Sequence, residues 1–266
     1  MDFIKGHGTE NDFVLLPDPD DRLTLTPELV RAICDRRAGI GADGVLRVVR
    51  SDSAADFFMD YYNADGTTGE MCGNGLRVFA RYLVAAGLAE PGEWPVLTRA
   101  GLRGVRVGTD GPIRTDMGAP EFLAAAPAVG GRPGVAVSMG NPHVVVQLPD
   151  QTELAALDLT RAPEVDGALP DGQNVEFVVR RGPRSIAMRV HERGVGETRS
   201  CGTGVCAAAA VAAGVADGED WTVTVPGGEL QVRWDAQTMY LSGPAVLVAS
   251  GQLDTEALVP AAEASL

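Results

Sequence analysis

The chain has 266 residues, a formal net charge of −14 at pH 7 and a mean hydropathy of +0.04. This length suits one large domain or two smaller ones, and the acidic balance argues against a nucleic-acid partner. The longest apolar run, residues 205–216, is too short to span a bilayer, and no secretory-signal pattern opens the chain. We therefore expect a cytoplasmic protein with no membrane partner, in which the four cysteines form no disulfide framework.

The first half predicts short strands around two helices. Thr26 as N-cap and Pro27 at the first helical position predict a helix that runs to about Arg37. A second helix is predicted over residues 76–86, closed near Gly87. Strands are predicted at 3–4, 12–16, 45–49 and 57–62, with three more between residues 95 and 117.

The second half repeats this pattern after a stretch rich in Ala, Pro and Gly, residues 119–134, which we interpret as the crossover. A short helix is predicted at 153–156 and an alanine-rich helix after Cys201. Strands are predicted at 135–138, 144–148, 174–177, 186–192, 221–225, 230–234, 239–241 and 246–249. We expect two domains, residues 1–118 completed by about 250–266 and residues 119–249, each with strands wrapped around one dominant helix.

Two cysteines share one local setting. Cys72-Gly-Asn-Gly and Cys201-Gly-Thr-Gly each lead into a predicted helix, and their separation, 201 − 72 = 129, is close to half of the chain. The first N–H groups of a helix lack intrahelical partners and carry partial positive charge. We therefore expect each thiol to be shifted toward thiolate and a carboxylate to bind the adjacent backbone. Free cysteines often only pack as small apolar residues, but packing does not explain a matched pair.

A pair of thiols suggests a reaction. If both helix starts reach one α-carbon, a thiolate can remove its proton while the opposite thiol returns one to the other face, which inverts the centre. Lys5 is the only lysine and lies at a predicted strand end, so a pyridoxal Schiff base is not expected. No zinc-site spacing and no nucleotide loop is found. We expect neither a cofactor nor a metal.

Motifs along almost the whole chain resemble the diaminopimelate epimerase family. They are Lys5–Val14, Gly41–Gly44, Asn63–Gly66, Met71–Gly75, Gly140–His143, Asn174–Phe177, His191–Gly204 and Pro226–Gly228. The resemblance implies a cofactor-independent isomerase that interconverts LL- and meso-2,6-diaminopimelate, on the route to lysine and peptidoglycan. It also implies an α/β fold of α+β-like type, with two pseudo-symmetric domains, each a mostly antiparallel, barrel-like sheet around a central helix, and a homodimer.

The same resemblance implies roles for individual residues. Cys72 and Cys201 match the catalytic pair, and His143 and Glu192 match residues that tune the two thiols. The implied substrate contacts are Asn11, Asn63, Gly73, Asn74, Asn141, Asn174, Glu192, Arg193, Gly202 and Thr203. By themselves, asparagines at turns are more typical of structure than of function, and the resemblance reverses this. For His143 a packed histidine, and for Arg193 a surface arginine, is the alternative, but a functional role is favoured for both.

Five further positions were considered beside these roles. Gly44 stands where many members have a glutamine, and Glu10 replaces a common glycine, for which only a local effect is expected. Cys206 lies about 140° around the helix from Cys201 and is assigned to the core. Tyr61, with its neighbour Tyr62, is assigned to the sheet.

Two other functions remain open on the sequence. A related cofactor-free racemase acting on proline or hydroxyproline would use the same thiols, but its substrate has no distal carboxylate for Arg193. A thiol-redox protein would pair Cys72 with Cys201 as a switchable disulfide. Neither cysteine motif contains a second cysteine to resolve a mixed disulfide, which argues against this function.

Overall fold

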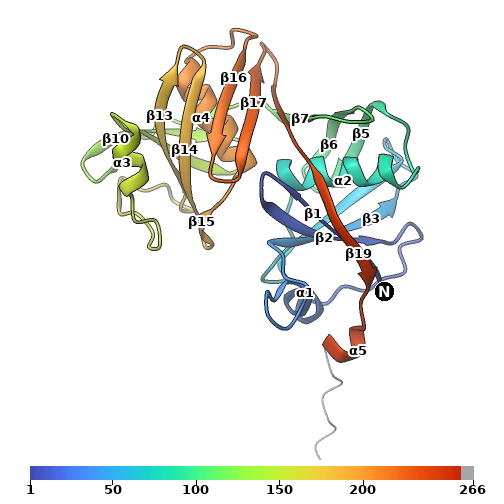
Figure 1. The fold of residues 1–266 in the computed structure, drawn as a ribbon. Helices are drawn as coiled ribbons and strands as arrows, with labels where there is room; N and C mark the ends of the chain where they lie inside the picture. Colours follow the sequence, from blue (N-terminus) through green and yellow to red (C-terminus); the bar gives the residue numbers. More distant parts are fainter. Residues whose placement is uncertain (259–266) are drawn as a thin grey trace, which may run out of the picture. The chain divides into compact units, whose positions relative to one another are not determined.

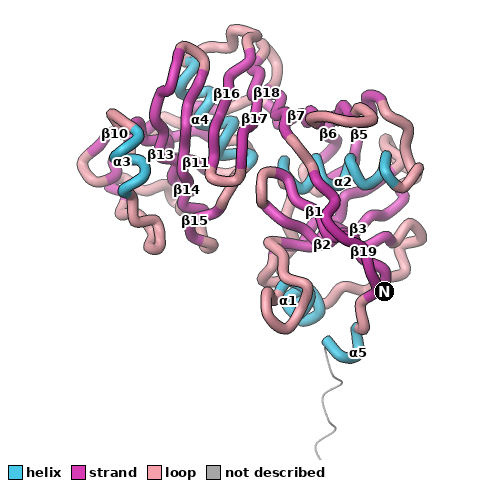
Figure 2. Tube along the Cα trace, in the orientation of Figure 1, coloured by secondary structure: helices cyan, strands magenta, loops and turns pink. Residues whose placement is uncertain are grey.

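The computed structural model describes residues 1–258, so the end of the expected segment 250–266 lies outside the described residues. The chain forms two compact units (Figure 1). Unit 1 comprises Met1–Gly8, Asp12–Ile113 and the chain from Ala245 onward, and unit 2 comprises Thr9–Asn11 and Arg114–Pro244. Residues 1–258 form 19 strands and five helices, a mixed α/β fold dominated by sheet (Figure 2). The expected domain limits at residues 118 and 249 stay a prediction.

Unit 1 is built from seven strands and three helices. They are β1 (Asp2–Gly8), β2 (Asn11–Pro17, which begins on the last residue of a unit 2 segment), α1 (Pro27–Cys34), β3 (Gly44–Arg50), β4 (Phe57–Asn63), α2 (Gly73–Ala85), β5 (Gly92–Thr98), β6 (Gly101–Val107), β19 (Val246–Gln252) and α5 (Thr255–Leu258). Strand β2 pairs with β3 in parallel, and β3 pairs with β4 antiparallel. Strand β1 pairs antiparallel with β19, which brings the two ends of the described chain together.

Helix α2 is the centre of unit 1. It packs against β1, β3, β6 and β19. Its side chains Leu76, Val78, Phe79 and Leu83 are fully buried in one core cluster, in which strand residues from β2 to β7 also take part. Tyr82, on the same helix, is half-buried. The apolar side chains, spaced for one helical face, therefore fix the helix inside its sheet.

Unit 2 follows the same plan. Its elements are β7 (Ile113–Gly118), β8 (Glu121–Phe122), β9 (Ala128–Val129), β10 (Arg132–Ser138), β11 (Pro142–Gln147), α3 (Gln151–Ala156), β12 (Val165–Asp166), β13 (Asn174–Gly182), β14 (Ser185–Glu192), β15 (Gly196–Thr198), α4 (Gly202–Ala213), β16 (Asp220–Val225), β17 (Gly228–Trp234) and β18 (Met239–Gly243). Strand β11 pairs with β13 in parallel, and β13 pairs with β14 antiparallel. The second unit thus repeats the pairing of β2, β3 and β4.

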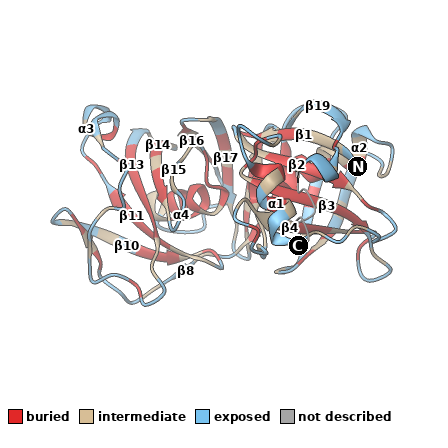
Figure 3. Ribbon diagram, turned by 90° about the horizontal axis from the view of Figure 1, so that it is seen from below, coloured by how far each residue is buried: buried red, intermediate tan, exposed pale blue. Residues whose placement is uncertain are grey.

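Helix α4 is buried nearly all round (Figure 3). Residues 205–210, a valine, a cysteine and four alanines, are at most 1% exposed, and the helix packs against strands on several sides, among them β11, β13, β14 and β17. Small side chains let strands approach such a helix from every side, which explains its alanine run. Cys206 lies in this core, as expected. The helix ends at Gly214, whose φ of 76° is left-handed.

The predicted ends of strand β1 and helix α1 were both wrong. Strand β1 does not stop at Ile4, because its pairing with β19 continues to His7. Helix α1 ends at Cys34 rather than near Arg37, because the Asp35 carboxylate accepts the backbone N–H groups of the two residues at 37 and 38. The segment 119–134, interpreted as the crossover, holds β8, β9 and the start of β10. No helix in the described chain is long and apolar enough to cross a membrane.

Candidate active site

Cys72 is itself the N-cap of α2. Its extended backbone precedes the helix, and the Gly75 N–H, 3.5 Å from Cys72 Sγ, donates to the sulfur. The helix therefore begins at Gly73, earlier than the predicted residue 76, and the Gly-Asn-Gly motif forms its first turn. Gly73 and Asn74 are buried there. Because a side-chain acceptor at this position satisfies a free N–H group, the cysteine sets the start of the helix.

The start of α2 lies among apolar side chains and one arginine. A Cβ at Gly75 would lie 3.3 Å from Leu46 Cδ2 and 3.4 Å from the Phe13 ring. Arg77 is fully buried, and its guanidinium donates to Asn74 Oδ1 at 2.9 Å and to the Gly73 carbonyl at 3.4 Å. Sequence reasoning missed Arg77, because a charged residue beside a predicted helix face is usually exposed.

Cys201 caps α4 in the same way. Gly204 N lies 3.4 Å from Cys201 Sγ and donates to it, and Thr203 Oγ1 lies 3.5 Å from the sulfur. The residue is 6% exposed, whereas Cys72 is half-buried. Gly202 is also buried, in the first turn. The two predicted reactive motifs therefore share one capping geometry, each within its own unit.

The expected shift of Cys201 toward thiolate is wrong. Burial removes the thiolate from water, and the nearby carboxylates of Glu192 and Glu176 repel it, so the pKa of Cys201 lies well above its ordinary value. Contacts with the Thr203 hydroxyl and the Gly204 N–H lower the pKa but do not compensate. The helix start is thus outweighed by burial and by two acidic neighbours.

Glu192 lies at the end of β14 and interacts with Cys201 and Thr198. Burial, and then the charge of Glu176, raise its pKa, although the Thr198 hydroxyl donates to Glu192 Oε1 and the side chain also hydrogen-bonds Cys201. A carboxyl group with a raised pKa beside a thiol with a raised pKa can exchange a proton with it. The expectation that Glu192 tunes a thiol stays a prediction, and this geometry supports it.

His143 lies on β11, fully buried, between two side chains. Its Nδ1 lies 2.7 Å from Glu176 Oε1, and its Nε2 lies 3.0 Å from Asn141 Oδ1. Glu176 on β13 is also fully buried, and a Cβ at Gly204 would lie 2.6 Å from its Oε1. Sequence reasoning missed Glu176, although its place between apolar residues of a predicted buried strand was a usable signal.

Asn174 has both ends of its amide engaged. Its Nδ2 donates to the Pro142 carbonyl at 3.2 Å, and its Oδ1 accepts from the Arg193 backbone N–H at 2.9 Å. Arg193 is exposed, and its guanidinium donates to the Asp171 carbonyl. Asn174 therefore ties the turn that carries Asn141 to the loop that carries Arg193.

Asn63 is oriented by a tyrosine. The Tyr61 hydroxyl donates to Asn63 Oδ1 at 2.8 Å, and Asn63 Nδ2 donates to Thr67 Oγ1 at 3.0 Å. A Cβ at Gly44 would lie 2.6 Å from the carbonyl of Tyr62 and 2.8 Å from Tyr61 Cε2. The tyrosine ring thus takes the space that a side chain at residue 44 would need. Tyr61, assigned to the sheet alone, also belongs to this neighbourhood.

The segment Thr9–Asn11 lies in unit 2 and is held by the Pro226–Gly228 turn. A Cβ at Gly227 would lie 1.9 Å from the Thr9 carbonyl, so only glycine fits there. The Gly227 N–H donates to the Arg199 carbonyl, and the Thr9 and Ser200 hydroxyls lie 2.7 Å apart. Glu10 has a left-handed φ of 61°, which explains why glycine suits this position, and its carboxylate pairs with Arg199.

The expected site residues fall into two groups. Unit 1 holds Asn63, Cys72, Gly73 and Asn74, and unit 2 holds Asn11, Asn141, His143, Asn174, Glu192, Arg193, Cys201, Gly202 and Thr203.

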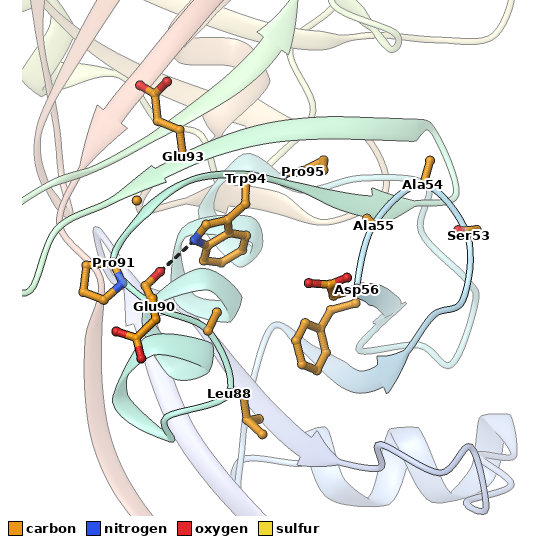
Figure 4. A pocket seen from close by; sticks show the side chains of 13 residues that line it. Ser53, Ala54, Ala55, Asp56, Leu88, Glu90, Pro91, Glu93, Trp94 and Pro95 are labelled. Carbon is orange, nitrogen blue, oxygen red and sulfur yellow. Dashed lines mark hydrogen bonds between the residues drawn. The ribbon is translucent and has the colours of Figure 1, made fainter.

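A separate hollow of about 660 Å³ in unit 1 is lined by Phe57, Trp94 and the loops beside them, and by none of the expected site residues (Figure 4). Within residues 1–258, no group of three or more His, Cys, Asp or Glu side chains is arranged to hold a metal ion.

Comparison with known proteins gives the family. A sequence model of the diaminopimelate epimerase family matches residues 3–123 and 135–248. A diaminopimelate epimerase of Streptomyces coelicolor is 49% identical over 277 residues, covering 95% of each chain. The fold is similar to a PhzF-family phenazine biosynthesis protein of Bacillus anthracis (TM-score 0.73, 18% identity, 95% of this chain and 98% of that chain). It is equally similar to a probable proline racemase of Agrobacterium radiobacter K84 (TM-score 0.73, 16% identity, 97% of this chain and 95% of that chain). The chain belongs to the diaminopimelate epimerase family.

Proposed function

We propose that this chain interconverts LL- and meso-2,6-diaminopimelate without a cofactor, with Cys72 and Cys201 as its two acid/base groups. One observation carries the proposal: each unit starts its central helix on a cysteine whose sulfur accepts the N–H of the third helical residue. Family membership and the 49% identical relative named diaminopimelate epimerase support the substrate.

The proposed reaction needs both sulfurs at opposite faces of one α-carbon. One thiolate takes the α-proton, so that a C–H bond breaks and an S–H bond forms, and the electron pair stays on the carbon beside its carboxylate. The other thiol then gives its proton to the opposite face and becomes the thiolate. No electrons are gained or lost. Because the pKa of Cys201 is raised, this residue suits the role of the thiol that gives the proton. In that direction of the reaction, Cys72 is the thiolate that takes the α-proton.

The helix starts also supply the charge stabilisation that the carbanion needs. In the proposed complex, the backbone N–H groups of the first turns, at Gly73 and Asn74 and at Gly202 and Thr203, bind the reacting carboxylate. Aligned N–H groups at a helix start stabilise an anion most strongly where water is excluded.

The remaining expected residues have supporting roles in this scheme. Asn11, Asn63, Asn141 and Arg193 contact the substrate and its distal amino-acid end, and Asn174 supports that contact by holding Arg193. Glu192 and His143 tune the thiols. We further propose that the enzyme acts in the cytoplasm as a homodimer, in the supply of lysine and peptidoglycan precursors. Sedimentation equilibrium at assay concentrations tests the dimer.

The function is tested by assaying LL-diaminopimelate, L-proline and trans-4-hydroxy-L-proline side by side in heavy water, with and without a chelator. We expect inversion of diaminopimelate alone, with deuterium at the inverted α-carbon and no effect of the chelator. Inversion of either proline substrate instead would support the racemase alternative. Loss of activity with the chelator would contradict catalysis by the two thiols alone.

A further inference from the structure

Glu176 and His143 form a buried pair, in which Glu176 has no role assigned by the proposed reaction. Both side chains are 0% exposed, and Nδ1 and Oε1 lie 2.7 Å apart. The other oxygen, Glu176 Oε2, is buried without a hydrogen-bond partner among residues 1–258. Within that part of the chain, His143 is therefore the hydrogen-bonding partner that this carboxylate has. A buried carboxylate with a free oxygen is costly, so its presence needs an explanation.

In unit 1, uncharged residues stand at the positions that correspond to His143 and Glu176. In the parallel pair β2–β3, Phe13 faces Gly44 and Leu15 faces Leu46. In the parallel pair β11–β13, His143 faces Asn174 and Val145 faces Glu176. Phe13 therefore corresponds to His143, and Leu46 corresponds to Glu176.

The correspondence extends to the helix starts. Leu46 and Phe13 lie against Gly75, the third residue of α2, and Glu176 lies against Gly204, the third residue of α4. Phe13 and Leu46 are both fully buried. An apolar pair thus completes this corner of the fold in one unit. Buried ion pairs are often no more stabilising than well-packed apolar residues of similar volume, so stability does not explain the charged pair in the other.

What the pair does follows from the two contacts of the imidazole. A carboxylate accepts only, so it holds a proton on the ring nitrogen that faces it. Nδ1 faces Glu176 Oε1, and Nε2 lies 3.0 Å from Asn141 Oδ1. A neutral ring with its proton on Nδ1 can only accept at Nε2, so the Asn141 amide must turn to present its NH2 group to the ring and its oxygen to a ligand. The state of Nε2 decides which end of the Asn141 amide turns toward the ring, and hence which end is offered to a ligand.

We propose that Glu176 is a positioning residue, which holds the His143 proton on Nδ1 and thereby orients the amide of Asn141 toward substrate. The consequence for substrate rests on the proposed function, in which Asn141 contacts diaminopimelate. The effect on the ring does not depend on it.

The ring is tested directly by 15N NMR of ligand-free protein labelled at histidine. The chain has only three histidines, His7, His143 and His191, so the His143 signals are assigned by comparison with His143→Gln. We expect Nδ1 of His143 to carry a proton in the wild type. In Glu176→Gln, which keeps the shape but removes the charge, we expect this proton to move to Nε2 in a large fraction of molecules. A wild-type ring protonated only at Nε2, or identical spectra in the variant, would overturn the proposal.

Activity provides the second readout. We expect Glu176→Gln to lower kcat/KM for LL-diaminopimelate about tenfold or more, as loss of a carboxylate behind a functional histidine commonly does. The double variant His143→Phe/Glu176→Leu copies the pair of unit 1, and we expect it to fold with near wild-type Tm but to lose at least as much activity. Full activity, or failure of the double variant to fold, would mean that the pair is structural. If the wild type does not act on diaminopimelate, the proposed function fails, and the NMR result still decides the role of Glu176.

Discussion

Helices α2 and α4 begin with the same cap but in opposite chemical surroundings. In both, a cysteine sulfur accepts the N–H of the third helical residue, which is a glycine. Around α2 that glycine meets Leu46 and Phe13, and the buried cation Arg77 donates to the first turn. Around α4 it meets Glu176, and Glu192 lies beside the sulfur. One local motif thus serves in an apolar, cationic setting and in an acidic one.

This difference teaches that a helix start does not by itself set the protonation of its cysteine. At Cys201, burial and two carboxylates raise the pKa in spite of the N–H contact. A two-base epimerase needs one thiol and one thiolate at a time, and two identical surroundings would not favour either arrangement. The different surroundings of the two helix starts therefore favour one of the two arrangements, the one with the proton on Cys201.

The largest effect is expected from removing either sulfur. We expect Cys72→Ala and Cys201→Ala each to lower kcat by about 10³-fold or more, because each removes an acid/base group. Epimerisation of LL-diaminopimelate, followed by deuterium incorporation at the α-carbon, measures the loss. The matched controls are Cys34→Ala and Cys206→Ala, which we expect to keep the chemistry. An alanine variant at residue 72 or 201 with full activity would refute the two-base scheme.

A smaller effect is expected from the two glycines that the helix starts share. In Gly204→Ala the new methyl group would lie 2.6 Å from Glu176 Oε1, so the carboxylate must move. We expect a loss in kcat/KM of about 10- to 100-fold, since misplacement by an ångström at a site has effects of this size. Gly75→Ala, whose methyl group meets flexible Leu46 at 3.3 Å, is the control and should change kcat/KM less than about threefold. Equal losses in both variants would remove the distinction between the two helix starts.

Thiol reactivity tests the contrast without substrate. We expect iodoacetamide at pH 8 to modify Cys72 at least about tenfold faster than Cys201, because Cys72 is half-exposed and Cys201 is buried with a raised pKa. Burial raises the pKa of Cys34 to about 12, so this residue serves as the unreactive reference. Peptide mass spectrometry gives the rates. In Glu192→Gln the rate at Cys201 should rise and that at Cys72 should not; faster modification of Cys201 in the wild type would contradict the assignment.

The smallest effect is on the pH dependence of stability. Asp12 in unit 1 and Glu192 in unit 2 change stability with pH in opposite directions. Burial opposes ionisation of Asp12, but hydrogen bonds and charges from Arg36 and Lys5 lower its pKa from 3.8 to about 2. Asp12 therefore binds a proton more readily in the unfolded chain than in the folded one. Above pH 3.8 it contributes about 2 kcal/mol to the free energy of unfolding, and this contribution is lost as the pH falls through 2. Burial raises the pKa of Glu192, so its contribution is complete below pH 4.5 and is lost as the pH rises through the folded value.

Urea unfolding of two variants between pH 2 and 8 separates these signs. Asp12→Asn should lose stability relative to the wild type as the pH rises from 2 to 5. Glu192→Gln should gain stability relative to the wild type as the pH rises above about 4.5. The same sign of slope in both variants would show that the two carboxyl groups do not differ as described.

Much of the architecture could be read from local pattern. Glycines mark turns and cysteine-glycine motifs mark helix starts, since few residues satisfy these backbone positions. The Thr26 cap of α1 and the two strands on either side of Pro226–Gly228 were predicted from such signals and are confirmed. The end of α1 was not, because the capping role of Asp35 competes with a helical pattern that continues beyond it.

The family and its reaction were within reach of the sequence alone, because the motifs are specific in combination. The two cysteines that we propose as the catalytic pair were also visible there, because Cys-Gly-x-Gly repeats at about half the chain length. The electrostatics were decided only by the tertiary structure. Parallel pairing of β11 with β13 carries Glu176 beneath the start of α4, whereas the equivalent pairing of β2 with β3 carries Leu46 beneath α2. A pKa depends on burial and on charges brought close by folding, so neighbours in the sequence could not reveal that Cys201 retains its proton more firmly than a helix start alone suggests.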